Sequence, residues 1–358
     1  MPDPIGPHIL ADDLTGALDS AAAFATTARP LDIGWRPGGP LPAAGAVDAA
    51  TREGHAREAA ERHKALAGWL ADGRPAFKKI DSLMRGHWAV EIAALATARP
   101  DRRIVIAPSF PFQGRVTRDG RQWRVGSNEP LGPSIADTLA SAGIDRQQFV
   151  VRDAQTDADL DAAVADESAG GYRVLWVGTG GLAAALARAG GMNATAPDVD
   201  LPRPLLALIG SHHPVTFGQI ARAEAVDPGC HIRLGGGPNA FGAVLSRLER
   251  GQAALVTVAF EGDRASAARV IAERFARLLE ASPRPGCLFV AGGETLRDVA
   301  EAVGAEGLAV EGALEAGLPV SRLRGGRLHG LAVISKSGAF GRPELLVDLA
   351  AALGAMSR

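Results

Sequence analysis

Two adjacent carboxylates follow a short apolar segment near the start of the chain. Ile9 and Leu10 lead into Asp12 and Asp13, and a helical pattern begins at Leu14. Like charges side by side repel each other, so such a pair persists where a cation, a metal ion or a substrate hydroxyl offsets the repulsion. In an open α/β sheet, ligands bind at the carboxyl ends of the strands. A simpler interpretation is that one aspartate caps the helix and the other is solvated.

A second polar turn follows an apolar segment near residue 80, where Lys79 leads into Asp81, Arg85 and Gly86. A guanidinium holds a carboxylate or a phosphate through two parallel hydrogen bonds, and a glycine lets backbone approach a ligand closely. Arg85 is therefore a candidate for binding an acidic substrate group. A surface ion pair between Asp81 and Arg85 explains the segment equally well.

A third turn covers residues 107–115 and is stiffened by two prolines and a glycine. Its Gln113 and Arg115 are candidates for contacting a small polar ligand, although a rigid loop alone also explains the pattern.

Three turns in the second half of the chain are typical of phosphate binding. One contains Ser211 and precedes a helix, and another follows the predicted strand 287–291 and starts a helix with two glycines. Backbone N–H groups at such junctions face a bound anion. The last turn follows the final strand and adds a lysine, two hydroxyls and two glycines. We predict that these residues bind a nucleotide: Ser211, Gly292, Gly293, Glu294, Thr295, Lys336, Gly338 and Gly341.

Other motifs carry less weight. His212 and His213 point in different directions on regular backbone and have no acidic or thiol partner at ligand spacing, so we predict no protein-bound metal site. Residues 178–183 match a loose dinucleotide fingerprint without the expected acidic residue, and we interpret them as a tight strand–helix turn. Cys230 and Cys287 lie far apart and predict neither a zinc site nor a disulfide framework.

Length and composition limit the classes of protein. The chain has 358 residues, 47% hydrophobic and 22% charged, with a formal net charge of −2. This length fits two domains, and this charge gives no field that would attract nucleic acid. We see no apolar run long enough to span a membrane and no signal peptide, so a cytoplasmic protein is expected.

Short apolar segments alternate with Ala-rich helical patterns along the whole chain. This alternation predicts an α/β fold of two domains, each with a mostly parallel sheet flanked by helices. We expect the active site to lie in the interdomain cleft, where water would be excluded from the reaction. The proline-containing stretch 190–204 is the predicted linker, which gives domains of residues 1–200 and 201–358. The predicted strands are 8–11, 76–80, 104–107, 174–177, 205–209, 254–259, 287–291 and 331–334, and the predicted helices include 14–27, 53–71, 182–189 and 265–279.

Taken in order, these segments resemble the four-carbon acid sugar kinases. The shared segments are Ala11–Gly16, Lys79–Gly86, Ala107–Pro111, Gly210–Ser211, Gly292–Thr295 and Lys336–Gly341. The resemblance implies an N-terminal domain that binds a sugar acid and a C-terminal domain that binds ATP. It also implies phosphorylation of the terminal hydroxyl of threonate, erythronate or 3-oxo-tetronate.

The substrate site expected from these segments consists of Asp12, Asp13, Lys79, Asp81, Arg85 and Gly86. Phosphoryl transfer to an alcohol needs a base, and Asp13 or Asp81 is the candidate; either is also a candidate for holding Mg²⁺ through water. Lys336 and the glycine turns would hold the ATP phosphates. The oligomeric state is left open, with a homodimer as one alternative.

The chain departs from the family pattern at several of these positions. Leu83, Met84 and His87 replace the usual Thr, Leu and Asn, and His212 and His213 replace the usual Cys and Ser. An alternative hypothesis is therefore a sugar-acid or nucleotide-binding protein of this family without turnover.

Overall fold

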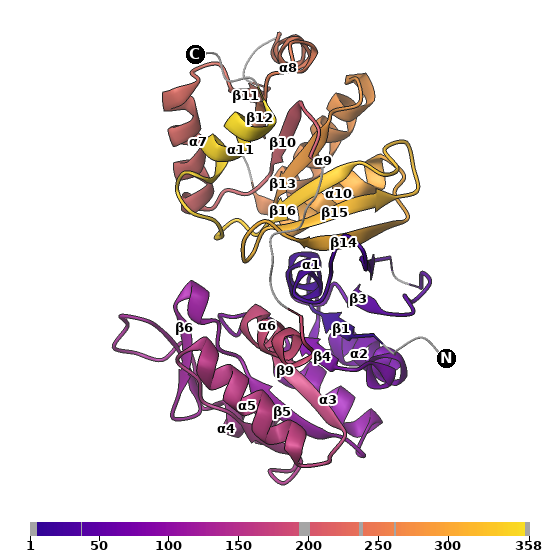
Figure 1. The fold of residues 1–358 in the computed structure, drawn as a ribbon, viewed down its shortest axis with the longest axis vertical. Helices are drawn as coiled ribbons and strands as arrows, with labels where there is room; N and C mark the ends of the chain where they lie inside the picture. Colours follow the sequence, from indigo (N-terminus) through magenta and orange to yellow (C-terminus); the bar gives the residue numbers. More distant parts are fainter. Residues whose placement is uncertain (1–5, 37, 193–200, 236–238, 261–262, 355–358) are drawn as a thin grey trace. The chain divides into compact units, whose positions relative to one another are not determined.

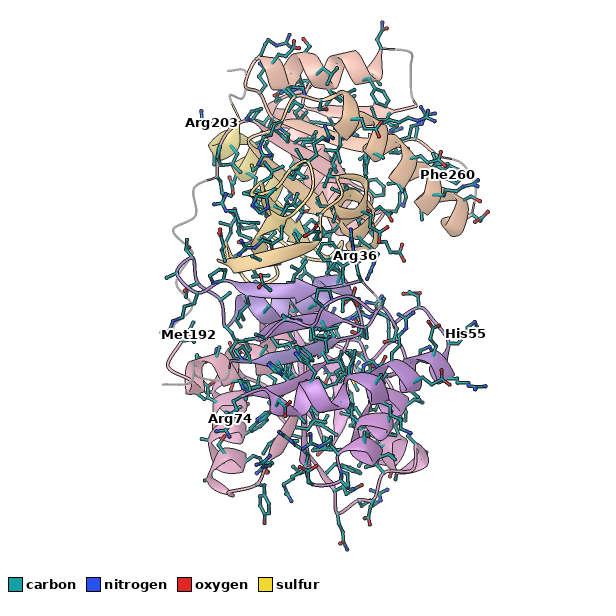
Figure 2. The ribbon with its side chains drawn as sticks, turned by 90° about the vertical axis from the view of Figure 1, so that its right-hand side faces the viewer. Arg36, His55, Arg74, Met192, Arg203 and Phe260 are labelled. Carbon is teal, nitrogen blue, oxygen red and sulfur yellow. The ribbon has the colours of Figure 1, made fainter. Side chains whose placement is uncertain are left out.

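The computed structural model describes residues 6–36, 38–192, 201–235, 239–260 and 263–354. The chain divides into two compact units, residues 1–196 and 197–358, called unit 1 and unit 2 below (Figure 1). Met192 and Arg203, marked in Figure 2, lie on either side of residues 193–200, which fall outside the described ranges. Most of the predicted linker lies there, so the predicted domain boundary stays a prediction. No helix within the described ranges is long and apolar enough to cross a membrane.

The sheet of unit 1 is parallel throughout its named strand pairs. Its strand order is β2-β3-β1-β4-β9-β5-β8. Its strands are short and largely apolar because helices cover both faces. They are β1 (His8–Ala11), β2 (Leu31–Gly34), β3 (Gly45–Asp48), β4 (Ala76–Lys79), β5 (Arg103–Ala107), β8 (Phe149–Val151) and β9 (Val174–Gly178).

The helices of unit 1 form two packed groups, α1, α5 and α6 in one and α2, α3 and α4 in the other. Side-chain oxygens cap several of them, including Ser134 on α4 and Thr179 on α6, because the first N–H groups of a helix lack partners. The helices are α1 (Leu14–Ala22), α2 (Ala56–Asp72), α3 (Trp88–Ala98), α4 (Ile135–Ser141), α5 (Asp157–Ala169) and α6 (Gly180–Ala189). A short 3₁₀ turn, η1 (Pro111–Gln113), and a hairpin of β6 (Arg115–Arg118) and β7 (Arg121–Arg124) lie between β5 and α4.

The sheet of unit 2 is parallel from β11 through β12, β10 and β13 to β16 and ends in two antiparallel strands, β15 and β14. Its strands are β10 (Leu205–Ile209), β11 (His231–Leu234), β12 (Ala254–Val258), β13 (Cys287–Ala291), β14 (Gly307–Ala313), β15 (Pro319–Arg324) and β16 (Ala332–Lys336). Its helices are α7 (Pro214–Val226), α8 (Ala240–Glu249), α9 (Arg264–Ala281), α10 (Gly293–Ala302) and α11 (Leu345–Leu353).

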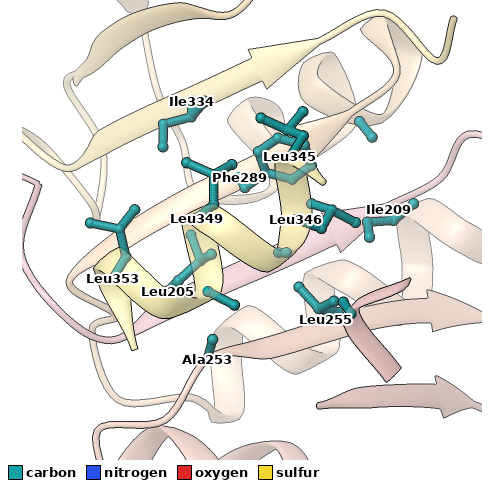
Figure 3. Close-up of a cluster of buried hydrophobic side chains, with 14 of the residues drawn as sticks. Leu205, Ile209, Ala253, Leu255, Phe289, Ile334, Leu345, Leu346, Leu349 and Leu353 are labelled. Atoms are coloured by element: carbon teal, nitrogen blue, oxygen red, sulfur yellow. The ribbon is translucent and has the colours of Figure 1, made fainter. Parts of the chain in front are cut away.

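The core of unit 2 is clearest where α11 packs against the sheet (Figure 3). Leu345, Leu349 and Leu353 repeat every four residues and so lie on one face of the helix. They belong to one buried cluster with Phe289 of β13 and Ile334 of β16. This packing fixes the strands whose ends carry the predicted nucleotide turns.

The predicted fold class is confirmed, and β1, β10 and β13 have the predicted bounds. Weakly apolar strands were not predicted, among them β2, β3, β6 and β7, along with the antiparallel pair of β14 and β15. α1 ends at Ala22, short of the predicted Thr27, because Thr26 and Arg29 exchange backbone hydrogen bonds in a turn.

Each sheet has a switch point, where successive connections leave in opposite directions. In unit 1 this point is β1, which lies between β3 and β4, and in unit 2 it is β10, which lies between β12 and β13. Ligands of open α/β sheets bind outside the carboxyl ends of the strands at such points. Both sets of predicted site residues follow these strands.

Candidate active site

Three neighbouring strands of unit 1 deliver charged residues at their carboxyl ends. Asp12 and Asp13 follow β1, Arg52 follows β3 after a short loop, and Asp81 follows β4. The register pairs Ala11 at the end of β1 with the last residues of both β3 and β4, so the three ends are level. Residues about 40 positions apart in sequence therefore meet at one edge of the sheet.

Arg52 joins the three aspartates into one group, called the Arg52 cluster below. Its Nε donates to Asp12 Oδ2 (2.9 Å), and its Nη2 donates to Asp12 Oδ1 (2.7 Å). Its Nη1 donates to Asp13 Oδ2 (2.6 Å) and lies 3.7 Å from Asp81 Oδ1. Sequence analysis missed Arg52 because β3 was not predicted. The signal was present, since Ala46 and Val47 lead into Asp48 just as other apolar segments lead into polar strand ends.

The loop that carries Arg52 is held against β1. The N–H groups of Thr51 and Arg52 donate to the Asp12 carbonyl at 3.0 and 3.2 Å, and the N–H of Ala50 donates to Asp48 Oδ1 at 2.7 Å. Ala50 has a φ of 51°, a left-handed conformation that is uncommon for a residue with a side chain. Such strain is typical of functional loops and is maintained by the surrounding bonds.

Asp12 and Asp81 are ionised despite their burial. Burial alone opposes ionisation of Asp12, but Arg52, Lys78 and Lys79 outweigh that effect and hold the pKa of Asp12 below its usual range. Burial likewise opposes ionisation of Asp81, and the hydrogen bonds from Arg85 together with the charge of Arg52 hold its pKa low. Both groups are therefore permanent anions near neutral pH.

Asp81 is held within its own loop by Arg85. Arg85 Nε and Nη2 donate to the two carboxylate oxygens of Asp81 at 2.9 and 2.8 Å, and the N–H of Leu83 donates to Oδ2 at 3.0 Å. Met84 (φ 59°) and Gly86 (φ 80°) are left-handed. Two nitrogens of the Arg85 guanidinium thus already donate to Asp81, which is the ion pair that the sequence offered as an alternative to substrate binding. The role of Arg85 as a substrate contact stays a prediction.

Asp13 both caps α1 and belongs to the cluster. Its Oδ1 accepts from the N–H of Gly16 at 2.9 Å, and its Oδ2 accepts from Thr15 Oγ1 at 2.6 Å in addition to Arg52. Its side chain is 24% exposed, compared with 1% for Asp12 and 8% for Asp81. Of the three carboxylates, Asp13 is therefore the most accessible to a ligand.

A second layer of charge lies beneath the cluster. Lys78 Nζ is 2.9 Å from Glu91 Oε2, and Thr51 Oγ1 donates to Glu91 Oε1. Burial and then Lys78 lower the pKa of His63 to about 4, so this ring is neutral at physiological pH. Lys79 leaves β4 on the opposite face and donates to the Ile80 carbonyl at 2.9 Å.

The cations around the Arg52 cluster do not outnumber the anions. The cations are Arg52, Lys78, Lys79 and Arg85, and the anions include Asp12, Asp13, Asp81 and Glu91, with Asp48 at the end of β3. Lysine use is itself a signal, because the chain has four lysines and three of them, Lys78, Lys79 and Lys336, are buried at strand ends. Lysine is rarely buried without a specific role.

In unit 2, the predicted nucleotide turns meet closely at one edge of the sheet. A Cβ on Gly338 would overlap Ser211 Oγ, and a Cβ on Gly210 would overlap Thr295 Oγ1. Gly292 has a φ of 115°, which L side chains rarely adopt. The turns after β10, β13 and β16 therefore form one compact group of small residues, called the glycine edge below: Gly210, Ser211, Gly292, Thr295 and Gly338.

Lys336 is buried at the end of β16 and bonds neutral oxygens. Its Nζ donates to Thr216 Oγ1 (2.8 Å), the Phe340 carbonyl (3.1 Å) and the Gly338 carbonyl (3.3 Å). Burial lowers the pKa of Lys336 to about 8. These bonds shape the turn after β16 around the ammonium group. A direct contact of Lys336 with ATP phosphates stays a prediction.

The remaining predicted nucleotide contacts flank the glycine edge. Gly293 is the first residue of α10, and Glu294 lies exposed in its first turn. Gly341 is left-handed, with a φ of 87°. Gln219 Nε2 donates to the Gly341 carbonyl at 3.0 Å. The N-termini of α7 and α10 both start at this edge, and helix N-termini favour anions.

The adjacent histidines have structural positions. His213 Nδ1 accepts from the N–H of Val215 at 3.2 Å and caps α7, and the His212 ring lies 6.1 Å from the Phe217 ring. Within the described ranges, no group of three or more His, Cys, Asp and Glu side chains is placed to hold a metal ion.

Comparison with known proteins identifies the family. Residues 8–134 match a sugar-binding N-terminal domain, and residues 238–346 match a nucleotide-binding C-terminal domain. The chain is 30% identical to D-threonate kinase of Bordetella bronchiseptica, over 97% of this chain and 98% of that protein. It is 31% identical to D-threonate kinase of Cupriavidus necator, over 94% and 95%. The chain belongs to the four-carbon acid sugar kinase family.

Solved structures share the fold of this four-carbon acid sugar kinase family member. A Salmonella typhimurium LT2 protein aligns with a TM-score of 0.72 at 20% identity, over 96% of this chain and 98% of that chain. A Haemophilus influenzae protein aligns with a TM-score of 0.65 at 20% identity, over 95% and 98%.

The residues that depart from the usual pattern of the four-carbon acid sugar kinases make defined local contacts. Leu83 binds Asp81 through its backbone N–H, and a ring nitrogen of His87 lies 2.7 Å from the Gly54 carbonyl. Together with the capping role of His213, these contacts place the departing residues in the turns at both sets of strand ends.

Proposed function

We propose that this protein is an ATP-dependent kinase that phosphorylates the terminal hydroxyl of a four-carbon sugar acid of the threonate, erythronate or 3-oxo-tetronate type. The observation that carries the proposal is the Arg52 cluster, in which one partly buried arginine pairs with three aspartates at the switch point of the sheet. This cluster lies in the segment that matches a sugar-binding domain, and the full-length relatives named above are D-threonate kinases.

Asp13 is the base in this proposal. It is the most accessible carboxylate of the cluster, whereas Asp12 and Asp81 each accept two hydrogen bonds from an arginine side chain. Its helix cap and its bond to Arg52 fix the carboxylate in one orientation, so an acceptor hydroxyl meets a preorganised oxygen. General base catalysis contributes about 10²–10⁴-fold to the rate. Asp12, Asp81, Lys79 and Gly86 then position the base and the substrate.

The nucleotide is assigned to the glycine edge of unit 2. Its small residues let the turns after β10, β13 and β16 pack closely together, and the N-termini of α7 and α10 add favourable dipoles. Mg²⁺ enters with ATP as part of the nucleotide substrate, since the carboxylate oxygens of the Arg52 cluster already accept hydrogen bonds from the chain. The cleft between domains as the place of transfer stays a prediction.

The test is ATP consumption with a panel of four-carbon acids. The purified full chain is incubated with MgATP and each stereoisomer of threonate and erythronate, and with 3-oxo-tetronate. The expected result is turnover with one of them and a phosphate ester at the terminal carbon, identified by NMR. Calorimetric binding of an acid without turnover of any would instead support a non-catalytic binding protein and overturn the kinase assignment.

A further inference from the structure

The β6–β7 hairpin places two arginines directly opposite each other. Its antiparallel register pairs Arg115 with Arg124, and it pairs Thr117 with Gln122 two positions further along. Like charges directly opposite in a strand pair destabilise it. An anion bound between the two guanidinium groups would remove that repulsion.

The same face of the hairpin is fastened to the strand ends of unit 1. Side chains alternate along a strand, so Thr117 and Gln122 share a face with Arg115 and Arg124. Gln122 Nε2 donates to the carbonyls of Pro108 (2.9 Å) and Ser82 (3.2 Å). Ser82 follows Asp81 directly, so this bond attaches the arginine-bearing face to the loop that carries part of the Arg52 cluster.

These two arginines have no acidic partner in the part of the chain that the structure describes. Arg115 Nη1 donates to the Gln113 carbonyl at 2.7 Å, while its buried Nε has no hydrogen-bond partner among those residues. Burial and the neighbouring Arg124 lower the pKa of Arg115, whereas the charge of Asp81 acts in the opposite direction. Arg115 is therefore close enough to both groups for their charges to act on it.

The charge balance of the site gives these arginines a role. The four cations around the Arg52 cluster face at least four carboxylates, so they offer no net positive charge to an anionic substrate. Arg85, the cation first predicted to bind the substrate carboxylate, already grips Asp81. Arg115 and Arg124 supply the missing positive charge beside the same loop.

We propose that Arg115 and Arg124 bind the carboxylate of the sugar acid, an inference that rests on the function proposed above. The paired guanidinium groups supply the parallel donors that a carboxylate accepts. The residues thus determine specificity for acids over the corresponding neutral sugars, while Asp13 acts on the hydroxyl at the other end of the substrate.

The test compares R124Q and R115Q with R121Q, whose side chain lies on the opposite face of the hairpin. In R124Q the KM for the sugar acid should rise about ten- to a hundredfold, as expected for a lost charge-assisted contact, while the KM for ATP is unchanged. R121Q should leave both values unchanged. A rise in the KM for ATP with the acid unaffected would assign the arginines to a phosphate and overturn the proposal.

The primary amide of the same sugar acid is a control substrate that lacks the negative charge of the carboxylate. The wild-type protein should have a much lower KM for the acid than for the amide. R124Q should lose this preference, because the substitution raises the KM for the acid and changes the KM for the amide little. An equal rise in KM for acid and amide would overturn the proposal. Thermal melts show whether R115Q and R124Q are folded. If R115Q is unfolded, R124Q alone tests the proposal, because Arg124 is exposed and its replacement should not disturb the fold.

The proposed function and this inference fail in different ways. If the wild-type protein consumes no ATP with any acid of the panel, the kinase assignment fails, and calorimetric titration of the acids into wild-type and R124Q protein decides the inference. Binding that R124Q loses supports it. Equal binding, or no binding by the wild-type protein, overturns it.

Discussion

The carboxyl edges of the two sheets share a topology and differ in chemistry. In unit 1 the edge is made of charged side chains that pair with one another, with Arg52 between Asp12, Asp13 and Asp81. In unit 2 it is made of glycines and small hydroxyl residues, and its one lysine bonds only neutral oxygens among its described partners. In the proposed function, the first edge would recognise a ligand by charge and orientation, and the second through closely packed turns and helix N-termini. Changes of charge should therefore damage unit 1, and changes of volume should damage unit 2.

The largest expected effect is on the base. Asp13→Asn should lower turnover by about 10²–10⁴-fold, since asparagine caps α1 as well as aspartate does but cannot accept the proton. Thermal melts should show a folded protein, and steady-state assays with the accepted acid give the rate. Asp13→Asn with near-normal turnover would place the base elsewhere.

Arg52→Gln tests whether charge pairing holds the unit 1 edge together. Removing one partner of a buried ion pair costs about 3–5 kcal/mol, and here three carboxylates lose their common partner. The free energy of unfolding, measured in urea, should fall by that order. Arg57→Gln is the control, because the Arg57 side chain is 91% exposed and pairs with Glu61 at the surface. The free energy of unfolding of this variant should fall by about 0–1 kcal/mol. Similar losses for both variants would contradict the comparison.

Lys336 predicts a pH dependence for unit 2. Its pKa falls from 10.5 to about 8 on burial, so the charged form disfavours folding by on the order of 3 kcal/mol. This penalty is fully present below pH 8 and disappears as the pH rises to 10.5, because the unfolded chain holds more protons in that window. Relative to Lys336→Met, the wild-type protein should therefore gain stability from pH 8 to 10.5 in urea titrations. Lys64→Met, at an exposed site on α2, should parallel the wild type instead.

The smallest expected effect comes from adding one methyl group to a glycine of the glycine edge. Gly338→Ala adds a Cβ that overlaps Ser211 Oγ, and overpacking costs about 1–3 kcal/mol or displaces Ser211. ATP affinity measured by calorimetry should fall while the affinity for the sugar acid is kept. Gly218→Ala in α7 has open space and should be neutral or slightly stabilising. Unchanged ATP binding in Gly338→Ala would separate the glycine edge from the nucleotide site.

Local patterns predicted most of the central strands that are buried on both faces, although β3, which is also buried throughout, was missed. The continuous apolar runs of β1, β10 and β13 gave their bounds, because parallel strands covered by helices are apolar throughout. Strands with polar faces, such as β6 and β7 with their arginines, lack that signal. The hairpin was therefore not predicted, and only its first residue, Arg115, belonged to the turn of residues 107–115 that was considered as a ligand contact or a rigid loop.

The sequence by itself determined which residues end the buried strands, and hence that Asp12, Asp13 and Asp81 lie at one edge and the glycine turns at another. These features depend on neighbours along the chain, such as a helix start or a turn that needs glycine. Only the tertiary structure decided which residues distant in sequence become partners. Strand order brings Arg52 beside β1, and Thr216 of α7 bonds Lys336. The bond between Arg85 and Asp81, four residues apart, is local and was one of the two interpretations of the sequence. Pairing between strands distant in sequence is set by packing of the whole sheet, which no local pattern specifies.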